Sequence, residues 1–127
     1  MIGYVTLGTD DLDRSRAFFD ALFETIGARR LMQIDEQHGF TMYGTSLKAP
    51  TLVLTRPWDD QPMHRGNGYM VALVMDSPEK VDAFYARALE LGGTDEGAPG
   101  LRGGYHFAYF RDPDGHKFAV FAAPPRS

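Results

Sequence analysis

The 127-residue sequence predicts an α+β protein made of two consecutive βαβββ repeats. The first supporting observation is a repeat: an offset of 66 residues aligns the two halves without a gap, pairing residues 4–7 with 70–73 and Tyr43 with Tyr109. The second is that short segments alternate apolar and other residues, as half-buried strands do. The third is a segment in each half with apolar residues at helical spacing. We expect one domain over residues 1–127, with repeat units 1–58 and 66–127 joined by a linker over 57–67.

The first repeat is predicted to begin with a strand over residues 4–8. Asp10 and Asp11 can cap the helix that follows, because a carboxylate there accepts backbone N–H bonds and opposes the helix dipole. Gly27 is expected to end this helix. The face that the helix buries comprises Leu12, Ser15, Phe18, Phe19, Leu22, Phe23 and Ile26. Further strands are predicted over residues 29–34, 40–43 and 51–56.

The second repeat has the same order and clearer boundaries. A predicted strand over residues 68–75 precedes Ser77, a favourable N-cap, and Pro78, which suits the first helical position. Gly92 and Gly93 are expected to end the helix.

Two turn-rich segments lie in the rest of this repeat. Asp-Pro-Asp-Gly at residues 112–115 predicts a hairpin between strands over 105–111 and 117–122, because proline sets the first turn dihedral and glycine accepts a positive φ. Residues 97–104 are glycine-rich, and we expect a flexible connection or a mobile lid there.

Composition argues against several classes of function. The net charge is −4 and no basic run occurs, which disfavours a nucleic-acid partner. Cysteine is missing, so disulfides, thiolate metal sites and a cysteine nucleophile are excluded. No segment approaches 18 apolar residues and the N-terminus lacks a signal-peptide pattern, so no membrane partner is expected. We expect a soluble, cytoplasmic protein.

Two local motifs accompany this order of elements. Asp-Leu-Asp-Arg-Ser at residues 11–15 opens a Phe-rich helix, and the chain closes with Tyr-Phe-Arg-Asp-Pro-Asp-Gly-His-Lys at 109–117. Together they resemble the vicinal oxygen chelate superfamily, which includes glyoxalase I, bleomycin-resistance proteins and extradiol dioxygenases. The resemblance spans the whole chain. It implies that the repeats form a curled mixed-sheet cup with the helices on its outer face, and that the protein is a homodimer.

The resemblance also implies where a divalent metal would bind. In that superfamily the ligands, commonly His and Glu, come from the first and last strand of each repeat. The corresponding positions here are Tyr4, Val53, Met70 and Ala119. A hard divalent ion prefers carboxylate or imidazole donors, which none of the four supplies. We therefore expect that the usual metal site is lost and that the protein uses no metal or other cofactor.

Strand alternation separates two faces of the predicted sheets. The apolar face expected beneath the helices comprises Val5, Leu7, Leu52, Leu54, Val71, Leu73, Phe118 and Val120. The opposite face would line the cup and bind a ligand through Tyr4, Thr6, Thr51, Val53, Thr55, Met70, Ala72, Lys117, Ala119 and Phe121. Apolar side chains with a few hydroxyls and one amine are typical of a small-molecule pocket, although the same residues can simply fill the cup.

Other polar and aromatic residues leave their roles open. The histidines His38, His64 and His106 can act as acids or bases or lie in solvent, and Arg102 can meet an anionic ligand or remain solvated. Trp58, in the linker, can wall the cup or cover the helix layer.

Three functions remain in competition. The leading hypothesis is a metal-free protein of this superfamily that binds a small, partly apolar molecule, either to sequester it or to serve an unassigned reaction. The alternative is a glyoxalase-like lyase or dioxygenase whose divalent metal has non-standard ligands, such as Tyr4 with histidines. The third is an oligomerising scaffold with a vestigial cup. The residues identify neither the ligand nor any catalysed reaction.

Overall fold

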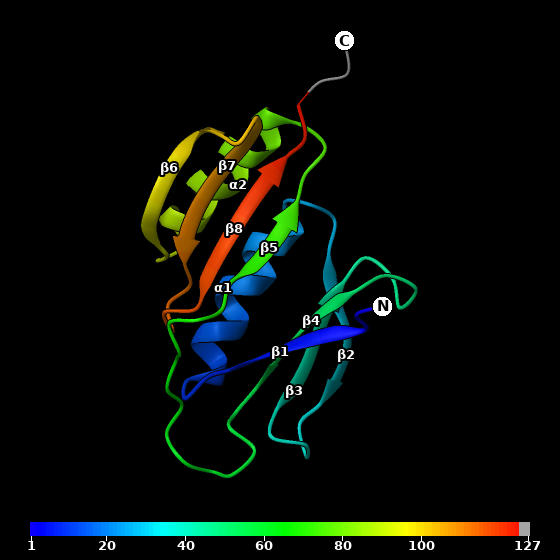
Figure 1. The fold of residues 1–127 in the computed structure, drawn as a ribbon. Helices are drawn as coiled ribbons and strands as arrows, with labels where there is room; N and C mark the ends of the chain where they lie inside the picture. The colour runs from blue at the N-terminus through cyan, green and yellow to red at the C-terminus, as the bar shows by residue number, and fades with distance from the viewer. Residues whose placement is uncertain (125–127) are drawn as a thin grey trace. The chain divides into compact units, whose positions relative to one another are not determined.

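The computed structural model describes residues 1–124, and the chain divides into two compact units, Met1–Arg65 and Gly66–Ser127 (Figure 1). Each unit has one helix and one four-stranded mixed sheet. The strand orders, β1-β4-β3-β2 and β5-β8-β7-β6, are the same when each is counted from the first strand of its unit. The predicted α+β class and the βαβββ order of both repeats are therefore confirmed. Residues 57–67, the predicted linker, contain no helix or strand.

Unit 1 contains β1 (Tyr4–Gly8), α1 (Leu12–Glu24), β2 (Arg29–Ile34), β3 (Phe40–Gly44) and β4 (Thr51–Thr55). Strand β1 runs parallel to β4, and β3 pairs antiparallel with both β4 and β2. The register sets Val5 beside Leu52 and Leu7 beside Leu54. These four side chains lie on the same face as Tyr43, whose ring contacts Phe19 and Phe23 of α1.

Helix α1 packs through the aromatic stripe that the sequence predicts. Phe19 and Phe23 are buried, with ring centroids 6.2 and 5.4 Å from that of Tyr43. Asp11 is the N-cap, since its carboxylate accepts from the Arg14 amide at 3.0 Å. Asp10 has a different role, because its Oδ1 accepts from the Met63 amide at 2.7 Å.

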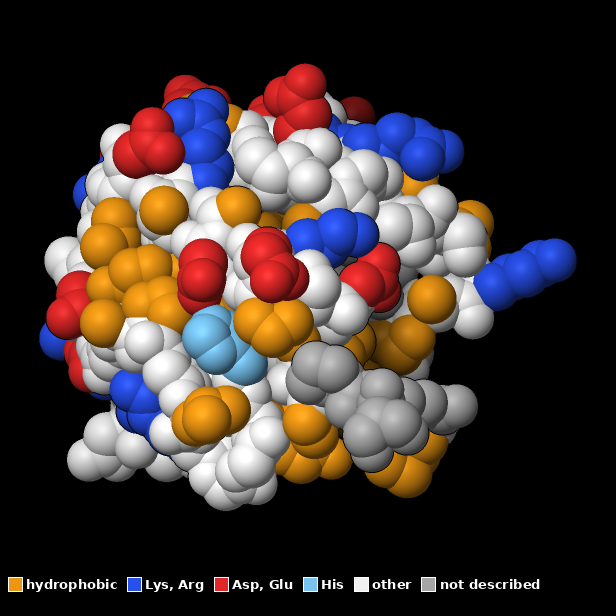
Figure 2. Space-filling view, turned by 90° about the horizontal axis from the view of Figure 1, so that it is seen from above, with side chains coloured by type: hydrophobic (Ala, Val, Ile, Leu, Met, Phe, Trp, Pro, Cys, Tyr) orange, Lys and Arg blue, Asp and Glu red, His pale blue; other side chains and the backbone are white. Residues whose placement is uncertain are grey.

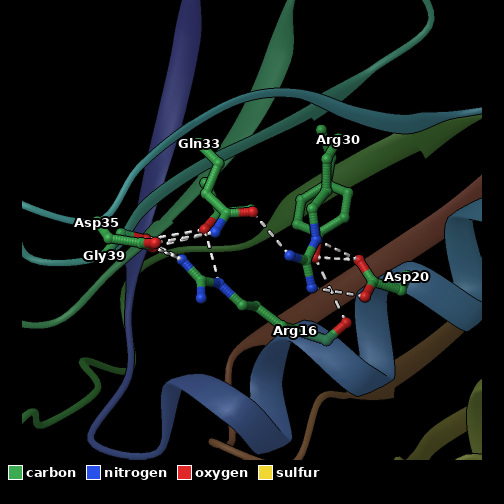
Figure 3. A network of polar contacts seen from close by, with 8 residues as sticks. Arg16, Asp20, Arg30, Gln33, Asp35 and Gly39 are labelled. Carbon is green, nitrogen blue, oxygen red and sulfur yellow. Dashed lines mark hydrogen bonds and ion pairs between the residues drawn. The ribbon is translucent and has the colours of Figure 1, made fainter.

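A polar network ties α1 to β2 and β3 at the edge of this core (Figure 3). The Tyr43 hydroxyl donates to Asp20 Oδ1 at 2.6 Å, and Arg30 donates to both oxygens of the same carboxylate at 2.9 and 2.7 Å. Burial raises the pKa of Asp20, but the hydrogen bonds from Arg30 and Tyr43 outweigh it and hold the pKa below its usual value. Arg16 bonds Thr41 and Asp35 at 2.9 and 2.8 Å. Side chains far apart in the sequence thereby fix the helix on the sheet.

Unit 2 contains β5 (Val71–Val74), α2 (Pro78–Glu90), β6 (Thr94–Arg102), β7 (Tyr105–Arg111) and β8 (Lys117–Ala122). Ser77 caps α2 and Pro78 occupies its first turn, as predicted. Buried Phe84 lies 6.1 Å from Phe110, which stacks at 5.3 Å on Phe118. The helix therefore covers the face of the sheet that carries Phe110 and Phe118.

The expected flexible connection or lid over residues 97–104 is wrong. Residues up to Arg102 belong to β6, an edge strand with two register shifts on either side of Gly97. A Cβ on Gly97 would lie 2.9 Å from Cδ2 of Tyr109, so glycine is needed there for close packing rather than for mobility. Gly103 and Gly104, with φ of 60° and 85°, form the turn into β7.

The gap-free offset of 66 residues also fails in the middle strands. Tyr43 pairs with Leu52 in unit 1, whereas in unit 2 it is Phe110 that pairs with Phe118. The structural counterpart of Tyr43 is thus Phe110, and Tyr109 projects from the opposite face of its sheet. Relative to unit 1, unit 2 has one residue more between its helix and β7 and one residue fewer between β7 and β8. The two differences cancel, so the helices and the last strands of the two units still begin 66 residues apart and the shift is hidden.

The turn at residues 112–115 forms as predicted. Gly115 has a φ of 89°, and Asp112 Oδ1 accepts from the amides of Asp114 and His116 at 3.0 and 2.8 Å. Asp112 is buried, and this burial raises the pKa of its carboxyl to about 6 although His116 and the backbone bonds act in the other direction.

Candidate functional site

Nine of the ten predicted ligand-binding residues lie in strands, on the helix-free face of their sheet, meaning the face opposite α1 or α2, and Met70 directly precedes β5. In unit 1 the register places Tyr4 beside Thr51 and Thr6 beside Val53. Val53 also pairs with Met42 of β3. Since Tyr43 contacts the helix, its neighbour Met42 and all of these partners face away from the helix.

The helix-free face of unit 1 is apolar at its centre and open at its edge. Val53 is fully buried, and Thr51 and Thr55 are nearly so. Tyr4 is 52% exposed, and its ring meets that of Phe40 edge-on at 6.2 Å. This face therefore has an accessible phenol on the edge strand β1, next to the buried residues of β4.

In unit 2 the same face carries Ala72, Lys117, Ala119 and Phe121, with Ala72 beside Ala119. Met70 lies just before β5, because that strand is shorter than the predicted 68–75, and its side chain is 43% exposed. The pairing of β8 with β7 places further residues on this face, which the sequence prediction did not include. An aromatic row, defined here as Tyr105, Phe107, Tyr109 and Phe121, covers this face.

The rings of the aromatic row are in mutual contact. Phe107 is nearly parallel to Tyr109 and to Phe121, at interplanar angles of 8° and 18° and centroid distances of 5.7 and 5.1 Å. Tyr105 lies 6.3 Å from Phe121 and is 43% exposed, while the other three rings are partly exposed. The row is a half-buried aromatic surface rather than part of the closed core.

Two cations lie against the aromatic row. The Arg102 guanidinium is 5.1 Å and the Lys117 amine 5.4 Å from the centroid of the Tyr109 ring. Arg102 also donates to the carbonyls of Phe107 and Ala98 at 2.9 and 3.1 Å, which fixes its position. In the described part of the chain, no hydrogen bond or ion pair engages the Lys117 amine.

The charge of the nearby acid Glu96 is balanced by another residue of the same unit. It forms an ion pair with Arg111, whose hydrogen bond holds the pKa of Glu96 below its usual value. Arg111 pairs across the strands with Lys117 and so belongs to the same face. Glu96 and Arg111 offset each other, so Arg102 and Lys117 leave an excess of positive charge around the aromatic row.

The remaining candidates make contacts within their own units. His38, at a φ of 55°, stacks on Trp58 at 4.3 Å and lies 3.3 Å from Asp60. His106 bonds Asp82 of α2 at 2.7 Å, on the face covered by the helix. Trp58 is 65% exposed, so it covers no helix core.

Metal donors are not clustered among the residues that the structure describes. Within residues 1–124, no group of three or more His, Asp or Glu side chains is arranged to hold an ion. Tyr4 and Val53 share the helix-free face of unit 1, and Met70 and Ala119 belong to unit 2. Their convergence on one centre stays a prediction.

Large apolar side chains are exposed among charged ones, as Figure 2 shows for one face of the molecule. Among residues 1–124, no helix is long and apolar enough to cross a membrane.

The sequence as a whole decides the family. A profile of the Glyoxalase/Bleomycin resistance protein/Dioxygenase superfamily matches residues 1–120. The chain belongs to this superfamily. The crystal structure of a glyoxalase/bleomycin resistance protein from Albidiferax ferrireducens T118 is 36% identical, with a TM-score of 0.86 over 98% of this chain and 99% of that one. The predicted resemblance is confirmed.

More distant solved structures share the fold. TnmS3, an antibiotic binding protein from Streptomyces sp. CB03234, is 22% identical with a TM-score of 0.71, covering 97% of this chain and 95% of its own. Lactoylglutathione lyase from Agrobacterium tumefaciens is 20% identical with a TM-score of 0.67, covering 96% and 92%. The search of curated proteins gave no match.

Proposed function

We propose that this superfamily member binds a small, partly apolar molecule on its helix-free sheet faces without the help of a metal. The observation that carries the proposal is the half-buried aromatic row of unit 2, which presents apolar rings beside two cations. Partly exposed aromatic side chains with a few charged groups are what small-molecule sites offer. An antibiotic binding protein with the same fold makes antibiotics a reasonable first class of compounds to test.

The donor set argues against the metal enzymes of the superfamily. The positions where their ligands are expected hold a phenol, two alkyl groups and a thioether, at Tyr4, Val53, Ala119 and Met70. These groups do not suit a hard divalent ion, which prefers carboxylate or imidazole. We therefore propose no Lewis-acid step, and we assign binding rather than metal-assisted catalysis to this face.

The proposed binding residues are those of the predicted face together with the aromatic row. Binding should raise the thermal stability of the protein, because a ligand that binds only the folded state stabilises it by mass action. A library of metabolites and antibiotics screened by thermal denaturation should therefore yield compounds that raise the melting temperature in proportion to their concentration.

Met70→Arg tests the location of the site. Met70 is 43% exposed, so the fold should tolerate a long charged side chain at this position. On the proposed face such a side chain would obstruct an apolar ligand. The matched control is Leu47→Arg, at a 67% exposed position in the β3–β4 loop. We expect Met70→Arg to lose ligand stabilisation and Leu47→Arg to keep it. Unchanged binding to Met70→Arg would refute the proposed location, and a library without a single binder would refute the function.

A further inference from the structure

We propose that the aromatic row of unit 2 binds a planar aromatic molecule that carries an acidic group. This inference rests on the proposed small-molecule function and names the chemical class of the ligand. Neither the superfamily match nor the relatives assign such a ligand to these residues.

The geometry of the rings favours a planar ligand. Phe107 stands between Tyr109 and Phe121 and is nearly parallel to both, so the row presents aligned rings rather than a closed hydrophobic cluster. Its members are partly exposed, which leaves their surface available for contact. A flat π system gains stacking contacts there in addition to buried area, whereas a flexible aliphatic chain gains area alone.

The charges favour an anion. The Lys117 amine lies 5.4 Å from the Tyr109 ring and forms neither a hydrogen bond nor an ion pair with another residue of the described chain. Arg102 uses two hydrogen bonds on backbone carbonyls, and a guanidinium has five N–H donors, so three remain. A carboxylate, sulfonate or phosphate above Tyr109 would meet both cations at once.

The same charges disfavour a cationic ligand, which an aromatic surface alone would attract. Tyr109 already has two cations within 5.4 Å of its centroid, and a third would be repelled by both. Glu96, whose pKa the charge of Lys117 helps to lower, forms its ion pair with Arg111. The inference therefore distinguishes ligands of equal shape by the sign of their charge.

Calorimetric titration of the full-length protein with three probes of one shape tests this distinction. The probes are 2-naphthoate, 2-naphthamide and 2-naphthylmethylamine at low ionic strength. We expect 2-naphthoate to bind about tenfold more tightly than the amide, because a charge pair at about 5 Å in a half-exposed site is worth about a factor of ten. The amine should bind more weakly than the amide.

Two variants separate charge from stacking. Lys117→Gln should weaken 2-naphthoate about tenfold and 2-naphthamide less than twofold, while the control Lys48→Gln, in the β3–β4 loop, changes neither. Phe121→Leu should weaken all three probes about fivefold, since leucine keeps the apolar contact and removes the ring.

The outcomes distinguish this inference from the proposed function. If naphthoate and naphthamide bind equally, or the amine binds best, and Met70→Arg abolishes binding, then the function stands and the acidic class is refuted. If Phe121→Leu leaves every affinity unchanged, the aromatic row is not the site. If neither the probes nor the library bind, the proposed function itself fails. Self-association that Phe121→Leu removes, without probe binding, would make the row an interface between copies and overturn the inference.

Discussion

The buried carboxyl of Asp112 should make stability depend on pH in an unusual direction. Asp112 is 3% exposed, and its Oδ1 accepts two backbone amides while Oδ2 has no hydrogen-bond partner among the described residues. Replacing it with asparagine keeps the accepting oxygen and removes the buried charge. We therefore predict that Asp112→Asn is more stable than the parent protein above neutral pH and equally stable in acid.

The size and sign of this stability difference follow from the pKa of Asp112. Burial raises the pKa of Asp112 from 3.8 to about 6, so the folded state holds its proton more tightly than the unfolded state. The stabilisation from this proton is complete below about pH 4 and is lost as the pH rises through about 6. A shift of about two pH units corresponds to about 3 kcal/mol at most. Asp112→Asn should therefore gain about 2 to 3 kcal/mol relative to the parent between pH 4 and pH 7.

Urea denaturation at a series of pH values measures this difference. Glu36→Gln, at an exposed position in the β2–β3 turn, is the control and should follow the parent at every pH. Asp112→Ala removes the acceptor for both amides as well as the charge, so it should be about 1 to 3 kcal/mol less stable than Asp112→Asn at all pH values. A difference between Asp112→Asn and the parent that does not change with pH would refute the reasoning.

Three further predictions concern the core, the assembly and the repeat. Tyr43→Phe removes the 2.6 Å hydrogen bond to Asp20 while Arg30 still pairs with that carboxylate, so urea denaturation should show a loss of about 1 to 2 kcal/mol, and no loss would exclude a stabilising role for this bond. Sedimentation at micromolar concentration should show a homodimer, because the edge strands of short sheets need cover; a monomer alone contradicts this. If the four aligned positions converge, a quadruple variant should bind about one equivalent of zinc or nickel that the parent does not bind. Elemental analysis that finds no more metal in the variant than in the parent would refute the convergence. The substitutions are Tyr4→His, Val53→Glu, Met70→His and Ala119→Glu.

Local signals in the sequence were sufficient for the helices and most strands. Asp11 and Ser77 cap their helices through side-chain oxygens, and Pro78 occupies the first turn, because these preferences depend on residues only a few positions apart. The Asp-Pro-Asp-Gly turn formed for the same reason. Such features need no knowledge of the tertiary structure.

The errors arose where packing between strands decides the structure. Gly97 suggested mobility, yet it lies in an edge strand, where the Tyr109 ring fills the space that a side chain would need. Compensating one-residue differences made the repeat look gap-free and aligned Tyr109 with the helix-facing Tyr43. The pairing of β7 with β8 reveals that Tyr109 faces the other way.

This shift also explains why the site prediction was incomplete. The alternation of Tyr105, Phe107 and Tyr109 is visible in the sequence, but alternation alone does not say which face of a strand is covered by a helix. The contact of Phe110 with Phe84 supplies that information. The aromatic row then joins Phe121, which the sequence did assign to the predicted binding face.

Titration of the library compound with the highest affinity into protein dialysed against EDTA tests metal-independent binding most directly. The same titration is repeated after addition of one equivalent of zinc, nickel, manganese or iron. We predict dissociation constants that agree within about twofold under all conditions, because the proposed face supplies rings and cations rather than metal ligands. Binding that disappears in EDTA and returns with one of these metals would contradict the proposal and favour the metal-dependent lyase or dioxygenase.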